Sequence, residues 1–234
     1  MQNNQTSNYQ DLLKTIAIIA VILDHLGLYF FPKYQILRAI GRFAMPIFCF
    51  FVGYNYKGPR HILAILGAIL TLMLWESFNI LSINMLLVMY IGQWCLYFME
   101  KCDRNAKSNI WIKIIILIVL IPITSEYLEY GSLALAFIMV GRCYKLKLGS
   151  MQLMGVVTLA SILFTLQPDY FHFSTMNQII AASLMLLEGY LMHSMNHLSP
   201  TGMNLRMISR NSLYIYFANV FFSIIGLVVM QLYR

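Results

Sequence analysis

Apolar runs recur along nearly the whole chain and are separated by short polar breaks. A helix needs about 20 residues to cross the hydrocarbon core of a bilayer, so runs of this length predict membrane-spanning helices. We expect an all-α fold, a polytopic transmembrane helix bundle that forms a single domain over residues 1–234. Totals of eight to ten spans fit, because Pro122 interrupts the fifth run. The best fit is about nine spans, at 12–31, 36–56, 61–78, 83–99, 110–125, 129–144, 150–167, 175–194 and 209–232.

The composition excludes two other classes of protein. Of the 234 residues, 60% are hydrophobic and 11% are charged, whereas soluble domains are about 25% charged. The mean hydropathy is +0.71, so the chain has far more apolar surface than a water-soluble or disordered protein exposes. We therefore expect a multi-pass protein in contact with membrane lipid.

The positive charge follows the connections between the predicted helices. The formal net charge of +7 is compatible with nucleic-acid binding, but most of the Lys and Arg side chains fall in alternate connections. That alternation is typical of membrane orientation, because connections rich in Lys and Arg stay in the cytosol. We expect a cytosolic N-terminus and no nucleic-acid partner. The basic connections carry Lys57 and Arg60, then Lys101, Arg104, Lys107 and Lys113, then Arg142, Lys145 and Lys147, then Arg206 and Arg210.

Ionisable side chains inside the first two predicted helices are the main candidates for function. Each costs about 2.5 kcal/mol or more in a membrane span, so each is a functional hypothesis by default. Asp24 and His25 lie well inside the first helix, and Arg42 lies at a similar distance from the turn at 32–33 on the antiparallel second helix. The His25 imidazole and the Arg42 guanidinium are therefore expected at similar depth. Arg38 shares a face of the second helix with Arg42, since four residues separate them.

Helix geometry limits how Asp24 and His25 act. Adjacent positions point about 100° apart, so both side chains face the bundle only if the first helix is central. This favours an ion pair between Asp24 and an arginine of the second helix. Two other interpretations stay open: a purely structural pair of Asp24 with Arg42, and a hydrogen-bonded core histidine at position 25. Clustering of a base, a carboxylate and guanidinium groups at one depth favours a site.

The same topology predicts a second set of polar residues on the outer side of the membrane. Its acidic members in the connection at 126–130 are also explained as solvated loop residues. Other polar residues lie deeper and are expected to line a path inward. The four cysteines show no CxxC spacing, so we expect no metal site. The outer set is Glu76, Asn84, Glu126, Glu129 and Tyr130, and the deeper set is Gln93, Glu188 and Asn219.

Short motifs surround these candidates. The first two predicted helices carry Asp11-Leu-Leu-Lys14-Thr-Ile-Ala, Leu-Asp24-His25, Ile-Gly41-Arg42-Phe-Ala-Met-Pro46-Ile-Phe and Gly53-Tyr-Asn55. Later motifs are Ile83-Asn84-Met-Leu-Leu, Glu129-Tyr130-Gly131 and Ser209-Arg-Asn211-Ser212-Leu-Tyr214. In this order, over essentially the whole chain, they closely resemble the TraX-type pilin acetylases, a family within a wider group of membrane acyltransferases. The block around the first two helices is the specific one.

The resemblance implies an enzyme, an acetyl-CoA-dependent N-acetyltransferase of the bacterial inner (cytoplasmic) membrane. The acceptor it implies is the N-terminal amine of a pilin subunit, as in conjugation, with acetyl-CoA as co-substrate and no metal. A cytosolic donor would have to reach an outer-side cluster, so we expect a continuous internal cavity. Members of the family tend to place a histidine where this chain has Asn219. Either Asn219 serves only for hydrogen bonding here, or the substrate differs.

For acetyl transfer, the candidates divide by their chemistry. An α-ammonium group has a pKa of about 8, so a base close to neutrality can remove its proton. We expect His25 to be that base. Asp24 either orients His25 or holds Arg42, and Arg42 stabilises an oxyanion or a CoA phosphate. The residues expected to bind substrate or CoA are Arg38, Asn84, Glu76, Glu129, Tyr130 and Asn219.

Other functions stay open at this level. The wider acyltransferase group makes an O-acetyltransferase of a cell-surface glycan the first alternative. A small proton-coupled transporter is another, because intramembrane Asp, His and Arg side chains also build proton relays. The chain has no internal repeat of the Asp24-His25 hairpin, which disfavours a carrier. A passive assembly subunit that does not bind CoA is a third. Direct transfer and a covalent acetyl-enzyme are both compatible with the sequence.

Overall fold

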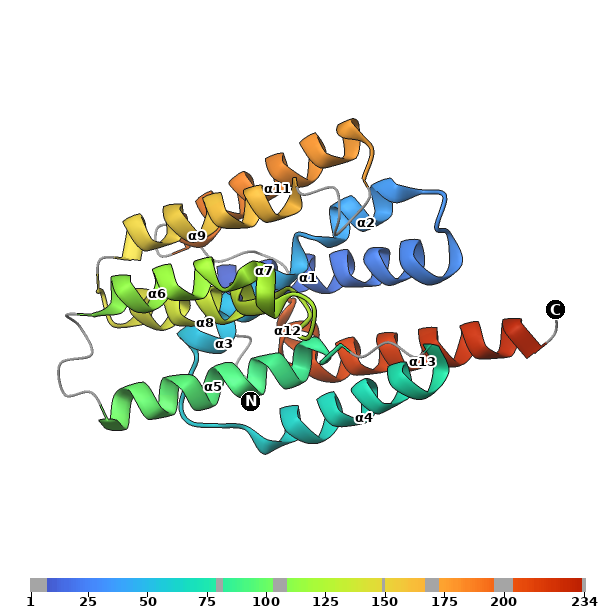
Figure 1. The fold of residues 1–234 in the computed structure, drawn as a ribbon, viewed down its shortest axis with the longest axis horizontal. Helices are drawn as coiled ribbons and strands as arrows, with labels where there is room; N and C mark the ends of the chain where they lie inside the picture. Colours follow the sequence, from blue (N-terminus) through green and yellow to red (C-terminus); the bar gives the residue numbers. More distant parts are fainter. Residues whose placement is uncertain are drawn as a thin grey trace. The chain divides into compact units, whose positions relative to one another are not determined.

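The computed structural model describes residues 8–78, 82–102, 109–148, 150–166, 173–195 and 204–232. These residues form an all-α protein (Figure 1), and the β feature found among them is a single parallel bridge between Ile83 and Leu128. The all-α class predicted from the apolar runs is confirmed. Its elements are α1 (Tyr9–His25), η1 (Leu26–Phe30), α2 (Gln35–Gly41), α3 (Ala44–Tyr54), α4 (His61–Phe78), α5 (Met85–Cys102), α6 (Ile110–Val119), α7 (Ile121–Thr124), α8 (Gly131–Lys145), α9 (Ser150–Thr165), α11 (Thr175–Ser194), α12 (Arg206–Arg210) and α13 (Ser212–Leu232).

The predicted helix 209–232 is divided at Asn211 between α12 and α13, and two other predicted helices are divided near a proline. The run 36–56 is divided between α2 and α3. Pro46 has no N–H to offer the carbonyl of Arg42 one turn earlier, and its ring crowds that carbonyl. The run 110–125 is divided between α6 and α7, and Pro122 stands in the first turn of α7. A missing N–H costs least at that position, since first-turn N–H groups have no partner within the helix.

Three stretches among the described residues are long and apolar enough to cross a membrane: Tyr9–Phe30, Gln35–Tyr54 and Ser212–Met230. Shorter apolar helices cover His61–Ser77, Ile110–Val119 and Met151–Thr165. Together these helices indicate a multi-pass membrane protein. The count of about nine spans and the cytosolic N-terminus stay predictions.

The chain divides into two compact units. Unit 1 consists of residues 1–47 and 165–234, and unit 2 consists of residues 48–164. Unit 1 contains α1, η1, α2, α11, α12 and α13, and unit 2 contains α4 to α8, most of α3 and nearly all of α9. The expected single domain over residues 1–234 stays a prediction.

Helix α1 is central in unit 1. It begins with a capping box, in which Asn8 and Asp11 each accept a hydrogen bond from the other's backbone N–H. Such a box satisfies N–H groups that have no partner within the helix. Both α2 and α13 pack against α1, and α11 packs against α2 (Figure 1). Because α1 has neighbours on more than one side, it buries more than one face.

In unit 2, α5 packs against α4 and α8, and α6 and α7 pack against α8. Helix α3 also lies close to α8, and this approach depends on glycine. A Cβ atom on Gly141 would lie 2.0 Å from the carbonyl oxygen of Phe50. The rings of Phe50, Tyr54 and Tyr144 pack on one another beside this contact, with centroids 5.7 to 6.3 Å apart. The ends of α3 and α8 therefore form a tightly packed pair.

Charged side chains separate toward opposite ends of unit 2. Arg142 in the last turn of α8 binds Glu100 near the end of α5 and the carbonyl oxygen of Tyr56 after α3. The opposite ends meet where Ile83 pairs with Leu128, beside the acidic Glu129. Within unit 2, the basic connections and the acidic connections thus lie on different sides, as the alternation of charge predicts. Arg104 and Lys107 lie outside the described residues.

Candidate active site

Asp24 and Arg42 form a buried ion pair between α1 and the end of α2. Nη2 of Arg42 lies 2.6 Å from Oδ1 and 2.8 Å from Oδ2 of Asp24. Nε of Arg42 also donates to the carbonyl oxygen of Arg38, at 3.3 Å. Asp24 is 9% exposed and Arg42 is 5% exposed, so the pair is largely desolvated. Hydrogen bonds between charged groups are about twice as strong as neutral ones, which fixes the guanidinium in place. The expected pairing of Asp24 with an arginine of the second helix is present.

Gly41 makes this ion pair possible. A Cβ atom at position 41 would lie 2.2 Å from Cβ of Asp24, well inside van der Waals contact. Only glycine therefore lets α1 and α2 approach closely enough for Asp24 to reach Arg42. In the Gly41-Arg42 motif, Gly41 permits the close contact between the helices, and Arg42 forms the ion pair across that contact.

His25 is held by Asn219 of α13. Nδ2 of Asn219 lies 2.6 Å from Nδ1 of His25, and His25 is 8% exposed. When the amide NH2 donates to Nδ1, a neutral imidazole carries its proton on Nε2. When the carboxamide turns by half a rotation, its oxygen accepts from Nδ1–H and the lone pair on Nε2 is free. The orientation of Asn219 therefore sets the tautomer of His25.

Two tyrosine rings flank the imidazole. The ring centroids of Tyr29 and Tyr216 lie 5.9 Å and 6.0 Å from that of His25. Tyr29 belongs to η1, a π-helix that begins directly after His25. π-Helical turns are rare and occur frequently at functional sites.

Asp24 and His25 serve two different neighbours. Asp24 contacts α2 through Arg42, and His25 contacts α13 through Asn219. The angle of about 100° between adjacent helix positions explains the division, because α1 packs against both helices. Of the two roles predicted for Asp24, the structure shows the contact with Arg42. The contact that orients His25 comes from Asn219.

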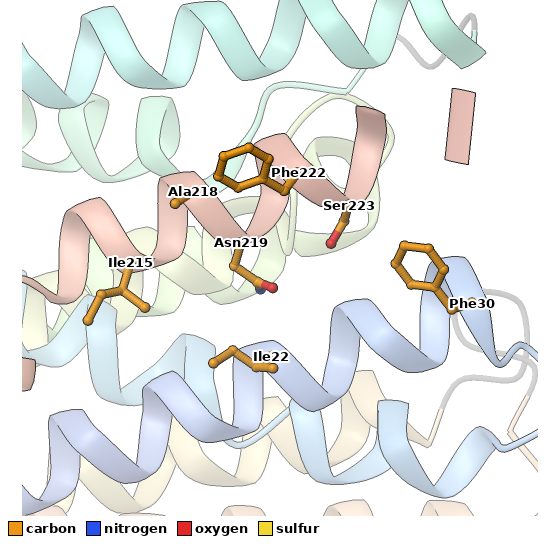
Figure 2. Close-up of a pocket in the computed structure, with 7 residues that line it drawn as sticks. All are labelled: Ile22, Phe30, Ile215, Ala218, Asn219, Phe222 and Ser223. Carbon is orange, nitrogen blue, oxygen red and sulfur yellow. The ribbon is translucent and has the colours of Figure 1, made fainter. Parts of the chain in front are cut away.

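A groove of about 480 Å³ adjoins the His25–Asn219 pair, between α1 and η1 on one side and α13 on the other (Figure 2). Its walls are mostly apolar, and Asn219 and Ser223 supply its polar groups. Because Asn219 lines the groove and also binds His25, a ligand there would touch the carboxamide that orients the imidazole. A continuous cavity through the bundle stays a prediction. The residues that line the groove are Ile22, Phe30, Ile215, Ala218, Asn219, Phe222 and Ser223.

Arg38 lies one turn before Arg42, and its side chain meets residues next to α11. Its guanidinium carbon lies 5.9 Å from the ring centroid of Phe173, within the range of a cation–π interaction. Nearby, Oε1 of Gln35 accepts hydrogen bonds from the backbone of Ser174 and the side chain of Asn177. These contacts tie α2 to the start of α11. Binding of an anionic substrate by Arg38 stays a prediction.

Glu188 is a deeply buried acid on α11. It is 1% exposed, and neither carboxylate oxygen has a hydrogen-bond partner among the described residues. Met185 and Met192 are buried on the same face of the helix. An ionisable group in such surroundings is costly. The expected place of Glu188 on a path inward stays a prediction.

In unit 2, Asn84 and Glu129 come together at the start of α5. Oδ1 of Asn84 accepts from the backbone N–H of Leu86, and a carboxylate oxygen of Glu129 accepts from that of Met85. Both side chains therefore cap the N-terminus of α5, a structural contact that uses their acceptor atoms. Their predicted binding of substrate or CoA stays a prediction.

The other candidates of unit 2 differ in their surroundings. Glu76 is exposed near the end of α4. Tyr130 has a φ of 63°, the left-handed region, directly before α8, and such a conformation costs about 1 kcal/mol or more for a residue with a side chain. Gln93 is buried and accepts from the backbone N–H of Arg60. Their contact with a substrate stays a prediction.

Comparison with known proteins identifies the family. A family model described as TraX protein matches residues 9–229. The chain belongs to the TraX protein family. The resemblance drawn from the sequence motifs is therefore confirmed. An uncharacterized protein of Rickettsia prowazekii (strain Madrid E) is 34% identical to this TraX chain over 221 residues, which are 90% of this chain and 88% of the relative.

A second, shorter similarity covers a quarter of this TraX chain. A probable fimbrial assembly protein FimC, serogroup H1, of Dichelobacter nodosus is 40% identical over 62 residues, 25% of each protein. No solved structure matches the chain.

Sequence analysis missed three residues of the TraX site: Gly41, Tyr29 and Tyr216. Tyr216 lies three residues before Asn219, so helical spacing places both side chains on one face of α13 and would have identified it. Gly41 was noted only as part of a motif. Its role depends on the close approach of α1, where a Cβ added to Gly41 would lie 2.2 Å from Cβ of Asp24, and no local pattern shows this approach.

Proposed function

We propose that this TraX family member is a membrane-embedded N-acetyltransferase that moves the acetyl group of acetyl-CoA to the N-terminal amine of a pilin subunit. One observation carries the proposal: a histidine held by an amide, on the same turn of α1 as a buried carboxylate–guanidinium pair. Acyl transfer to an amine needs a base for the attacking nitrogen and fixed positive charge or hydrogen-bond donors for the developing oxyanion. His25 and Arg42 supply these two groups.

Family membership supports this choice of reaction. The TraX family is associated with pilin acetylation. One similar protein is described as a probable fimbrial assembly protein. Both favour a pilus subunit as the acceptor over a glycan.

His25 acts as the base through Nε2. The acceptor ammonium, with a pKa of about 8, releases one proton to solvent. The neutral amine nitrogen then forms a bond to the acetyl carbonyl carbon, and Nε2 takes the second proton from that nitrogen. As the carbon–sulfur bond breaks, the imidazolium returns this proton to the departing sulfur. The atoms and charges of this reaction balance without an oxidant or a metal.

Asn219 is a positioning residue for His25. With its carbonyl oxygen toward Nδ1–H, it leaves the lone pair of Nε2 available, which the base role requires. An amide cannot titrate, so Asn219 does not exchange protons itself. The histidine that the resemblance to the TraX-type acetylases implies at this position would hold Nδ1 in a similar way, and we assign Asn219 the hydrogen-bonding part of that role.

Arg42 is the fixed cation, and Asp24 holds it. Nη2 of Arg42 binds Asp24 and Nε donates to the carbonyl oxygen of Arg38, and we assign the guanidinium anchored in this way to the developing oxyanion or a CoA phosphate. A guanidinium anchored on two atoms needs little reorganisation when charge develops, and such preorganisation is a major source of catalysis. Arg38 is a second cation one turn away for the same anionic groups.

The membrane arrangement follows from the charge pattern. We propose about nine spans, a cytosolic N-terminus and location in the bacterial inner membrane. The basic connections of unit 2 then face the cytosol, where acetyl-CoA is found. The groove beside Asn219 suits the apolar part of a membrane-inserted acceptor, since its walls are mostly apolar.

The deciding experiment uses the purified full-length protein with labelled acetyl-CoA. The acceptor is a peptide with the processed N-terminus of a pilin, and the same peptide with a blocked N-terminus is the control. We expect label on the free amine only. The His25→Ala variant should lose about 10²- to 10⁴-fold in rate while keeping its helical content. His61→Ala is the matched control, because His61 is an exposed histidine bound to Tyr90 in unit 2.

The outcomes separate the alternatives. Full activity of the His25→Ala variant would remove His25 as the base. If acetyl groups are found on a glycan fraction and none on the peptide, the acceptor is a glycan and the protein is an O-acetyltransferase. Label bound covalently to the protein after a brief incubation would replace direct transfer by a two-step route.

A further inference from the structure

One end of unit 2 is strongly basic. Three helix ends meet there, because Arg142 of α8 contacts Glu100 of α5 and the backbone of Tyr56 after α3. Among the described residues of this end, Glu100 is the one acidic side chain. We call this surface the basic end. Its cations are Lys57, Arg60, Lys101, Arg142, Lys145 and Lys147.

Aromatic rings hold several of these cations. Nζ of Lys145 lies 4.7 Å from the ring centroid of Tyr54, and the guanidinium carbon of Arg142 lies 5.4 Å from that of Tyr56. Both distances are within the range of cation–π interaction. A carboxylate would neutralise a lysine, whereas a neutral ring fixes it and leaves its charge in place. The ring of Tyr54 therefore positions Lys145 without pairing its charge.

Tyr56 at the basic end stays neutral at physiological pH. Burial, with the nearby carboxylate of Glu100, raises the pKa of Tyr56 above its ordinary value. Tyr56 therefore adds no negative charge beside Arg142. The positive field of this end is offset only by Glu100 among the described groups.

The platform under Lys145 is rigid. Tyr54 packs on Phe50 and Tyr144, and both neighbours lie on the tightly packed pair α3 and α8. At Gly141 the backbones of these helices approach so closely that an added Cβ would clash with the carbonyl oxygen of Phe50. A ligand that uses Lys145 therefore meets a cation whose position is already set, which lowers the entropy lost on binding.

We infer that the ring-held cations of the basic end, with Lys145 on Tyr54 as the central contact, bind the phosphate groups of a ligand. Phosphate anions pair well with preorganised cations. Two sources carry this chemistry at a membrane surface: a soluble donor with a phosphorylated nucleotide, such as CoA, and an anionic lipid headgroup. The choice of CoA rests on the proposed function, whereas the phosphate site itself does not.

The test measures binding to the full-length protein in nanodiscs by calorimetry at about 0.15 M ionic strength, where diffuse surface attraction is screened. The probes are CoA, dephospho-CoA and pantetheine, which carry three, two and no phosphates. A second arm repeats the titration in discs of phosphatidylcholine with or without phosphatidylglycerol. Lys145→Gln is the test variant. Lys57→Gln is its matched control, since Lys57 is an exposed cation of the same end.

We expect affinity to fall from CoA to pantetheine, and the Kd for CoA to rise about tenfold in Lys145→Gln, the loss of one charge-assisted contact. Lys57→Gln should change Kd by less than about twofold. The His25→Ala variant should bind CoA normally, so this site is separable from the proposed chemistry. An equal loss of CoA affinity in the two lysine variants would contradict a specific site at Lys145. It would show instead that the positive charge of the whole surface attracts the ligand. A different outcome is binding to phosphatidylglycerol that depends on Lys145, with no binding of CoA. That result would support a phosphate site but would show that its ligand is a lipid headgroup and not CoA.

Discussion

The carboxamide of Asn219 lies 2.6 Å from Nδ1 of His25, across 194 positions of sequence. This contact ties the last helix to the first and determines which imidazole nitrogen carries the proton. It also frees Asp24 from that task, because both carboxylate oxygens of Asp24 already bind Arg42. The proposed site therefore has two separate parts, a base with its amide and a cation with its acid.

The tautomer of His25 should depend on Asn219. We expect one tautomer in the wild-type protein and a mixture in Asn219→Leu, because leucine offers Nδ1 no partner. Nitrogen NMR of labelled histidine side chains measures this directly, with His61 as an internal reference. The rate of acetyl transfer should fall about 10- to 100-fold in Asn219→Leu. Asn219→His, which restores a hydrogen-bonding side chain, should recover most of it. An unchanged histidine spectrum in Asn219→Leu would contradict the assignment.

Variants of the Asp24–Arg42 pair should affect stability and activity differently. Arg42→Gln alone leaves a buried carboxylate and should lower the free energy of unfolding by about 3 to 5 kcal/mol. Removing both charges, in Asp24→Asn with Arg42→Gln, should recover most of that stability but not the rate. Chemical unfolding in detergent and the labelled acetyl assay give the two readouts. Recovery of full activity in the double variant would make the pair purely structural.

Arg42→Lys tests the shape of the cation. Lysine keeps the positive charge but has no Nε to donate to the carbonyl of Arg38, so its head group is less firmly placed. We expect kcat to fall about 100-fold, in the range seen when one oxyanion contact is removed. Unchanged kinetics in Arg42→Lys would show that any positive charge at this position suffices.

Gly41→Ala should break the contact between α1 and α2. The added Cβ would lie 2.2 Å from Cβ of Asp24, so one helix must move. We expect a loss of about 1 to 3 kcal/mol in stability, as for overpacked cores, together with loss of activity. Gly155→Ala is the control, because its Cβ would meet no atom within 4 Å. That control should be as stable as wild type or slightly more so. Equal behaviour of both variants would refute the packing argument.

Filling the groove should impair substrate binding more than chemistry. Ala218→Phe places a ring among Ile22, Ile215 and Phe222. We expect KM for the acceptor to rise about tenfold, a loss of about 1.4 kcal/mol, with kcat nearly unchanged. Ile225→Phe, on the same helix but outside the groove, should behave as wild type. If KM stays constant in Ala218→Phe, the groove does not hold the acceptor.

Helix positions were predictable because they depend on local pattern. The runs at 61–78 and 175–194 have the same bounds as α4 and α11, since apolar length alone defines a span. The break after Arg42 was not predicted, although Pro46 marks it, because a proline in an apolar run is also tolerated within a span.

The pairing of Asp24 with Arg42 was predictable for a similar reason. The two helices are joined by a short turn, so equal distances along them bring residues to one depth. Capping of α5 by Asn84 and Glu129 was not predicted. Local spacing places Asn84 at a helix start, but Glu129 lies 44 residues from Met85, whose N–H it accepts.

The sequence by itself determined the class of protein, the positions of the helices, the family and the expensive charges at Asp24, His25 and Arg42. These depend on composition, periodicity and the cost of ions in lipid, which are properties of short segments. Only the tertiary structure showed that Asn219 binds His25 and that Gly41 lets Asp24 pack closely against α2. Those relationships depend on which faces of distant helices meet, and side-chain packing between α1, α2 and α13 sets that choice.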